Sequence, residues 1–121
     1  MMKERNEILD KSFEFSVRIV NLYNYLKSNK HEYVLSKQLL RSGTSIGANV
    51  NEAQAAQSTA DFISKLAIAS KEARETKYWI NLLVETDYLD LNERSVKTLL
   101  DEITELIKLL TSIIKTLQSK K

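Results

Sequence analysis

The chain has no proline, and only two of its 121 residues are glycine, Gly43 and Gly47. A β-rich protein of this size needs glycine or proline at most of its tight turns. Their scarcity therefore predicts an all-α protein made of a few long helices. A chain of this length suits one ordinary domain and is too short for two, so we expect a single domain over residues 1–121.

Cysteine is also absent, which excludes disulfides, thiolate metal sites and cysteine nucleophiles. No stretch approaches the roughly 18 consecutive apolar residues of a membrane span, and the amino terminus lacks the apolar core of a signal peptide. We therefore expect a cytoplasmic protein with no membrane partner. The net charge is only +2, with acidic and basic residues mixed along the chain. Folding or assembly must then create any basic binding surface.

The last part of the sequence has the clearest helical pattern. Asp90 and Glu93 have the spacing of a capping box at its start, with Asn92 as the alternative cap. Its apolar residues recur at three- and four-residue steps, as in the seam of a helical bundle. They are Val96, Leu99, Leu100, Ile103, Leu106, Ile107, Leu110, Ile113, Ile114 and Leu117.

Three more helices are predicted before this one. The first runs from about residue 6 to residue 28, with a break at residues 28–31, and the second runs from about residue 32 to residue 56. Ser58 and Asp61 indicate the cap of a third helix that ends near Glu85. Short connections make consecutive helices antiparallel, so the sequence predicts an antiparallel up-down-up-down four-helix bundle.

The second predicted helix is unusually polar and contains both glycines, each of which costs a helix about 1 kcal/mol relative to alanine. Apolar residues nevertheless keep helical spacing through it, and the glycines lie where another backbone can approach closely. A polar stripe flanks its apolar face, and Asn49 lies between this stripe and the core. The stripe is formed by Arg41, Ser45, Ala48 and Glu52.

The third predicted helix has a comparable second stripe beside a main seam that includes Thr76. This stripe is formed by Ile68, Glu72, Glu75, Trp79 and Leu82. Antiparallel pairing puts Arg41 within reach of Glu72 or Glu75. We interpret the two stripes as a half-buried polar layer that fixes helix register. The alternative is a ligand or catalytic site built from Glu52, Glu72 and Glu75.

The available residues exclude several chemistries. A di-iron bundle site needs Glu-x-x-His on two helices, whereas the only histidine, His31, falls in a predicted turn. The glycines lack phosphate-loop spacing, and there is no nucleophile elbow. The hydroxyls of Ser42, Thr44 and Ser45 have no evident general base. We therefore assign no catalytic, cofactor-binding or metal-ligating residue and no small-molecule substrate, and we predict that the protein is not an enzyme.

The predicted helices carry more apolar residues than the seam of one bundle needs. Ile68, Trp79 and Leu82 lie beside a sufficient seam, and the first helix is apolar over a broad arc. Large exposed apolar patches usually mark a partner interface, so we expect a homo-oligomer.

Residues 41–53, 62–69 and 71–79 carry a resemblance to a known family. They read RSGTSIGANVNEA, FISKLAIA and KEARETKYW. This pattern closely resembles the bacterial 23S ribosomal RNA intervening-sequence proteins, also catalogued as four helix bundle proteins, and the similarity spans about residues 8–118. The matching signature positions are Arg41, Ser45, Ile46, Asn49, Glu52, Ala53, Glu72, Glu75, Thr76 and Trp79.

The resemblance implies an antiparallel four-helix bundle that assembles as a barrel-like homopentamer. Relatives include the accessory variability protein of diversity-generating retroelements, a pentamer that associates with nucleic acid and a reverse transcriptase. It implies no catalytic role for the signature positions.

Two functions remain. The leading hypothesis is a non-enzymatic oligomeric module that binds RNA or a ribonucleoprotein, because copying a modest basic patch around a ring gives a strong field. The alternative is a protein–protein adaptor or scaffold that docks a partner helix without binding nucleic acid. The candidate nucleic-acid contacts are Lys27, Lys30, Lys37, Arg41, Lys65 and Arg74.

Overall fold

The computed structural model describes residues 2–120, with side chains described for residues 7–120. In this part of the chain there are four α-helices and no strand, which confirms the all-α prediction. The helices are α1 (Met2–Asn29), α2 (Leu35–Ala53), α3 (Thr59–Glu85) and α4 (Arg94–Ser119). None of them is both long and apolar enough to span a membrane.

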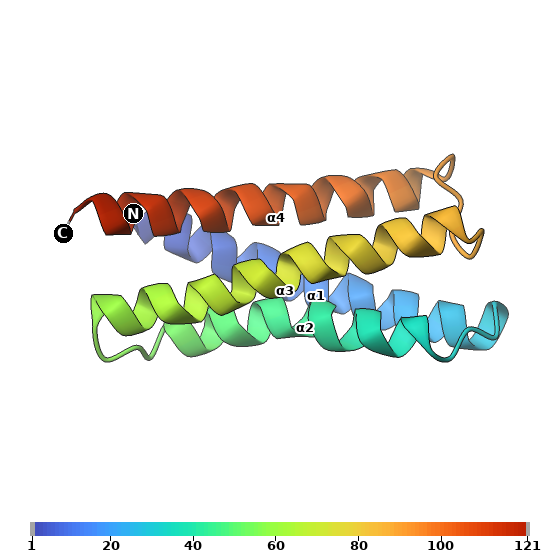
Figure 1. Ribbon diagram of the computed structural model, residues 1–121, viewed down its shortest axis with the longest axis horizontal. Helices are drawn as coiled ribbons and strands as arrows, with labels where there is room; N and C mark the ends of the chain where they lie inside the picture. The colour runs from blue at the N-terminus through green and yellow to red at the C-terminus, as the bar shows by residue number, and fades with distance from the viewer. Residues whose placement is uncertain (1, 121) are drawn as a thin grey trace.

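The four helices lie side by side, and consecutive helices run in opposite directions (Figure 1). Contacts between side chains agree with this arrangement. Arg41 of α2 pairs with Glu75 of α3, and further along α2 Glu52 pairs with Lys65, which comes earlier on α3. The backbone of α1 packs against α2 and α4, and that of α3 packs against the same two helices.

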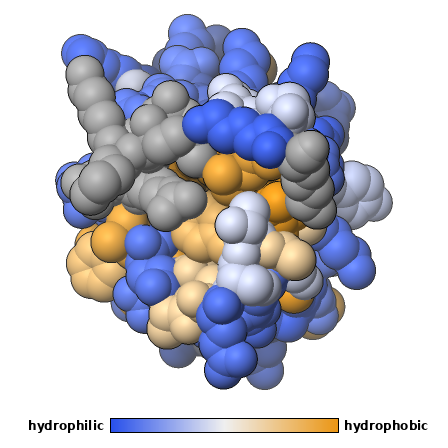
Figure 2. Space-filling view, turned by 90° about the vertical axis from the view of Figure 1, so that its left-hand side faces the viewer, coloured by the Kyte–Doolittle hydropathy of each residue, from blue (hydrophilic) through white to orange (hydrophobic). Residues whose placement is uncertain are grey.

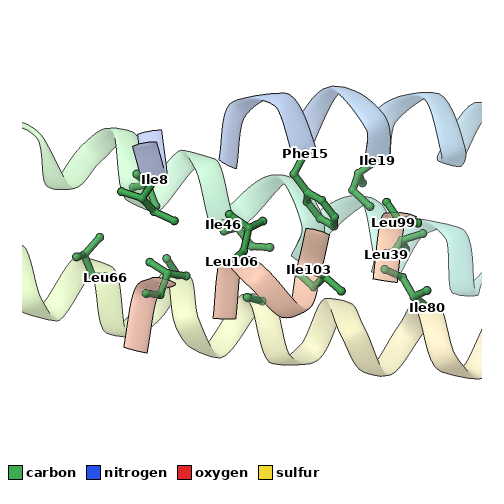
Figure 3. Close-up of a cluster of buried hydrophobic side chains, with 14 of the residues drawn as sticks. Ile8, Phe15, Ile19, Leu39, Ile46, Leu66, Ile80, Leu99, Ile103 and Leu106 are labelled. Carbon is green, nitrogen blue, oxygen red and sulfur yellow. The ribbon is translucent and has the colours of Figure 1, made fainter. Parts of the chain in front are cut away.

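Apolar side chains from all four helices meet in one core. On α4 the predicted seam is buried at Val96, Leu99, Ile103, Leu106, Leu110, Ile113 and Leu117. Burying each aliphatic side chain of this size contributes about 1.5–3 kcal/mol. Figure 3 shows core residues of the four helices pointing toward one another, among them Ile8, Phe15, Ile19, Leu39, Ile46, Leu66, Ile80, Leu99, Ile103 and Leu106. At the end of the bundle where α2 passes into α3, apolar surface lies in the middle of the view, with hydrophilic side chains below it and to its right (Figure 2).

The two glycines bring α2 close to α1. A Cβ atom on Gly47 would lie 3.1 Å from the carbonyl oxygen of Ser12, and one on Gly43 would lie 2.8 Å from two carbons of the Ile19 side chain. The close approach of another backbone is therefore confirmed at Gly47, where that backbone belongs to α1 of the same chain, whereas Gly43 meets a side chain of α1.

Several predicted helix ends differ from the structure. Helix α1 begins at Met2 rather than residue 6, and α2 spans Leu35–Ala53 rather than residues 32–56. The predicted cap of α3 is confirmed, because Ser58 Oγ accepts a hydrogen bond from the backbone N–H of Asp61 at 3.1 Å.

The capping box predicted before α4 is wrong. Glu93 occupies the N-cap position, and its side chain makes no capping hydrogen bond. The Asp90 carboxylate instead accepts a hydrogen bond from the backbone N–H of Asn92 at 2.9 Å, which shapes the turn before the helix.

Candidate functional site

The polar layer predicted between α2 and α3 centres on Arg41. Its guanidinium donates to the Glu72 carboxylate at 3.2 Å and also to the Glu75 carboxylate. Glu75 accepts a second hydrogen bond from the Trp79 indole N–H at 3.0 Å. The Glu72 side chain is only 14% exposed, whereas that of Arg41 is 50% exposed. Arg41 therefore holds two carboxylates of α3 from the rim of the bundle, as its predicted register requires.

A second polar contact lies deeper in the same layer. Thr76 Oγ1 lies 2.9 Å from Ser42 Oγ and 2.7 Å from the carbonyl oxygen of Glu72, so its proton has two acceptors. Both Ser42 and Thr76 are fully buried. A buried hydroxyl needs a partner, so this pair ties α2 to α3 inside the core. Thr76 is one of the signature positions predicted from the sequence, whereas Ser42 is not.

The other predicted members of the layer do not meet in one cluster. Ser45 Oγ donates to the Arg41 carbonyl at 2.6 Å, and Asn49 Nδ2 donates to the Ser45 carbonyl at 2.8 Å, both within α2. Glu52 pairs with Lys65 at 3.1 Å further along the interface. Glu52 therefore lies apart from Glu72 and Glu75, and the three do not form the carboxylate site considered as an alternative.

Nothing in the described side chains gathers metal ligands. Among residues 7–120, no group of three or more His, Cys, Asp or Glu side chains is placed to hold a metal ion. His31 is exposed in the α1–α2 turn, with a positive φ of 54°. Each carboxylate of the layer instead accepts a hydrogen bond from a cation or an indole. This arrangement joins the two helices.

The candidate nucleic-acid contacts are spread over the bundle. Arg41 and Lys65 are paired with glutamates of the helix interface. Lys27 lies 5.0 Å from the centre of the Tyr23 ring. Lys30 and Lys37 are exposed near the α1–α2 turn. The six residues therefore do not form a single patch.

Arg74 has different neighbours from the other five candidates. It lines a groove between α3 and α4, where it lies with Lys77 and Lys108. Neither lysine is among the predicted contacts. Lys77 follows Arg74 by three residues on α3, whereas Lys108 comes near Arg74 only through the packing of α4 on α3.

An apolar surface runs along α1. Phe13, Val17 and Val20 are 70%, 48% and 42% exposed, and their spacing places them on one side of the helix. Phe13 also borders a groove of about 590 Å³ between α1 and α2, together with Gly47 and Ala48. On α3, Ile68 is exposed, but Trp79 packs partly against the core. The exposed apolar surface predicted from the sequence therefore lies mainly on α1.

Glu32 has a structural role that the sequence did not reveal. Its carboxylate accepts hydrogen bonds from the backbone N–H groups of Val34 (3.2 Å), Leu35 (3.0 Å) and Ser36 (2.6 Å), at the start of α2. Burial alone would raise the pKa of this carboxyl group. The hydrogen bonds from Leu35, Ser36 and Val34 outweigh that effect and hold the pKa of Glu32 below its ordinary value.

A further ion-paired cluster joins α1 to α4. Lys11 pairs with Glu7 at 3.1 Å and with Glu105, and these hydrogen bonds, that to Glu105 above all, raise the pKa of Lys11 above its ordinary value. Arg18 pairs with Glu102. These cations are engaged within the bundle.

The sequence matches the 23S rRNA-intervening sequence protein family over residues 4–112. Among solved structures it is similar to a crystal structure of a protein with unknown function from the S23 ribosomal protein family of Bacteroides thetaiotaomicron. The two share 55% sequence identity and a TM-score of 0.87, over 93% of this chain and 98% of that chain. No match is found among curated proteins.

Proposed function

The chain belongs to the 23S rRNA-intervening sequence protein family, and from this premise we propose that it is a non-enzymatic, oligomeric helical bundle that binds RNA or a ribonucleoprotein. The observation that carries the proposal is local positive charge without an acidic partner among the described residues, where Arg74, Lys77 and Lys108 line one groove. Six glutamates are held by Lys11, Arg18, Arg41 and Lys65, while other cations of the described chain, such as Arg74, have no acidic partner.

Assembly is the second part of the proposal. The α1 surface of Phe13, Val17 and Val20 supports self-association, because removing exposed apolar surface from water stabilises the assembly that covers it. The family resemblance suggests five copies. A ring multiplies the unpaired charge of one subunit, and this gives a protein of low net charge a field strong enough to attract RNA.

Filter binding across a salt series tests RNA binding. We expect labelled single-stranded RNA to bind at low salt, with an affinity that falls as salt displaces the protein from phosphates. The absence of binding at low salt, or an affinity that does not change with salt, would contradict the proposal.

The groove between α1 and α2 favours a second candidate function. A volume of about 590 Å³ beside Phe13 suits an apolar side chain of a partner helix, as in a protein–protein adaptor. A pull-down with and without nuclease separates the two functions. Partners that survive nuclease support the adaptor, and partners released by nuclease support RNA binding.

A further inference from the structure

The groove between α3 and α4 gathers positive charge beside an exposed aromatic ring. Arg74 and Lys77 line it from α3 and Lys108 from α4, around a volume of about 390 Å³. Tyr78 lies in the same groove and is 60% exposed. Asn81 adds an amide that can donate and accept hydrogen bonds.

The described acidic side chains do not pair with these three cations. Among residues 7–120, no carboxylate forms an ion pair with Arg74, Lys77 or Lys108. The acids closest to Arg74 in sequence, Glu72 and Glu75, are directed to the α2 side of α3, where Arg41 holds them. Glu72 and Glu75 therefore do not neutralise Arg74 and Lys77 on the α4 side of α3.

We propose that this groove binds single-stranded RNA, with Arg74, Lys77 and Lys108 contacting phosphates and a base stacked on Tyr78. The proposal rests on the RNA-binding function above and specifies its site. Grooves that bind single strands combine cations along the backbone with aromatic rings that accept unstacked bases. An acidic peptide would use the cations but not the ring, and a duplex offers no unstacked base, so Tyr78 favours a single strand.

Trp79 provides an internal reporter for this site. The Tyr78 and Trp79 rings lie 5.2 Å apart in an edge-to-face arrangement, and the chain contains no other tryptophan. A base stacked on Tyr78 changes the surroundings of Trp79. We therefore expect a short oligouridylate to alter the tryptophan fluorescence of the full-length protein as it binds.

Charge neutralisation tests the phosphate contacts. The variant Arg74→Gln, Lys77→Gln, Lys108→Gln is compared with a control of equal net charge, Lys97→Gln, Lys115→Gln, Lys120→Gln, whose lysines are all exposed. The slope of log affinity against log salt should fall by about 2 for the groove variant, at roughly 0.7 per phosphate contact, and should change little for the control. Thermal melts verify that both variants fold.

Substitution of Tyr78 tests stacking separately from charge. We expect Tyr78→Ala to weaken oligouridylate binding roughly 5- to 150-fold and Tyr78→Phe to retain most of the affinity, because the ring remains. Tyr78 is 60% exposed, so the comparison does not depend on core packing.

The possible results of these experiments distinguish a wrong binding site from a wrong function. Wild-type protein that binds no oligouridylate at low salt would overturn the proposed function and the groove together. Wild-type binding that weakens equally in the groove and control variants, with unchanged Trp79 emission, would overturn the groove alone. Groove-dependent binding of polyglutamate without binding of RNA would assign the site to an acidic protein partner and overturn the RNA proposal.

Discussion

The hydroxyl oxygens of Ser42 on α2 and Thr76 on α3 lie 2.9 Å apart at the buried centre of the bundle. Thr76 has a second acceptor in the Glu72 carbonyl, whereas the next oxygen available to Ser42, the Leu39 carbonyl, is 3.5 Å away. The pair is therefore asymmetric, since Ser42 depends on Thr76 more than Thr76 depends on Ser42.

This asymmetry predicts the outcome of a double-mutant cycle. Thr76→Val leaves the buried Ser42 hydroxyl without a good partner and should lower the free energy of unfolding by about 1–3 kcal/mol. Ser42→Ala should cost less. The double variant should cost less than the sum, because both polar groups are then gone. Urea unfolding measures all three, and strictly additive values would show that the two hydroxyls do not interact.

The Arg41 pairing predicts a loss of stability when the cation is removed. Arg41→Ala leaves Glu72, which is mostly buried, without its cation. The guanidinium itself is half exposed and screened by solvent, so we expect a loss of about 1–2 kcal/mol. Lys37→Ala is the matched control, one helical turn earlier on the same helix and exposed. Equal thermal melts for the two variants would show that the pairing contributes nothing.

The antiparallel register explains why the Arg41–Glu72 pair could be predicted from the sequence, whereas the contact between Ser42 and Thr76 could not. Once the turn near Ser58 is located, helical spacing alone places Arg41 opposite Glu72. Ser42 belongs to the buried face of α2, and a serine there gives no sequence signal that distinguishes a cross-helix bond from a bond within the helix.

The capping and groove residues were missed for other reasons. Sequence rules for helix starts look for Ser, Thr, Asp or Asn at the cap, and Glu32 acts from two residues before the N-cap, Val34. Lys77 follows Arg74 by three residues on α3, so the two are neighbours on the helix surface. Lys108 joins them only when α4 packs on α3, and the apolar side chains of that interface do not reveal from the sequence which charged residues lie beside one another. By contrast, the α4 seam was predictable because its periodicity directly reflects burial.

Glu32 predicts a pH-dependent contribution to stability. Its carboxyl has a lower pKa in the folded protein than its ordinary value of 4.5, so the unfolded chain binds more protons at mildly acidic pH. The stabilisation is fully present above pH 4.5 and declines as the pH falls through the folded pKa. Glu32→Gln should therefore cost about 1 kcal/mol at neutral pH and progressively less in acid. Denaturant unfolding at several pH values measures the difference, and a constant difference between the two proteins would contradict the assignment.

The close contact at Gly43 predicts that Gly43→Ala destabilises the protein, although alanine has a higher helix propensity than glycine. A Cβ atom there would lie 2.8 Å from Cγ1 and Cγ2 of Ile19, a fully buried side chain that cannot move freely. The propensity gain of about 1 kcal/mol should be outweighed, leaving a net loss of about 1–2 kcal/mol. Ala48→Gly on the exposed side of α2 measures the propensity effect alone. A stabilised Gly43→Ala variant would mean that α1 and α2 separate at little cost.

The apolar side of α1 predicts how assembly can be broken. Phe13 is 70% exposed on α1, and Val34, in the α1–α2 connection, is 71% exposed. Phe13→Lys should weaken self-association at least tenfold, because burying one such side chain contributes about 1.5–3 kcal/mol at each subunit contact. Val34→Lys adds the same charge at equal exposure and should leave the assembly intact. Light scattering after size-exclusion chromatography gives the mass of each protein. A monomeric wild-type protein would remove the ring from the proposed function, and equal dissociation by both variants would show that added charge, rather than the α1 surface, governs assembly.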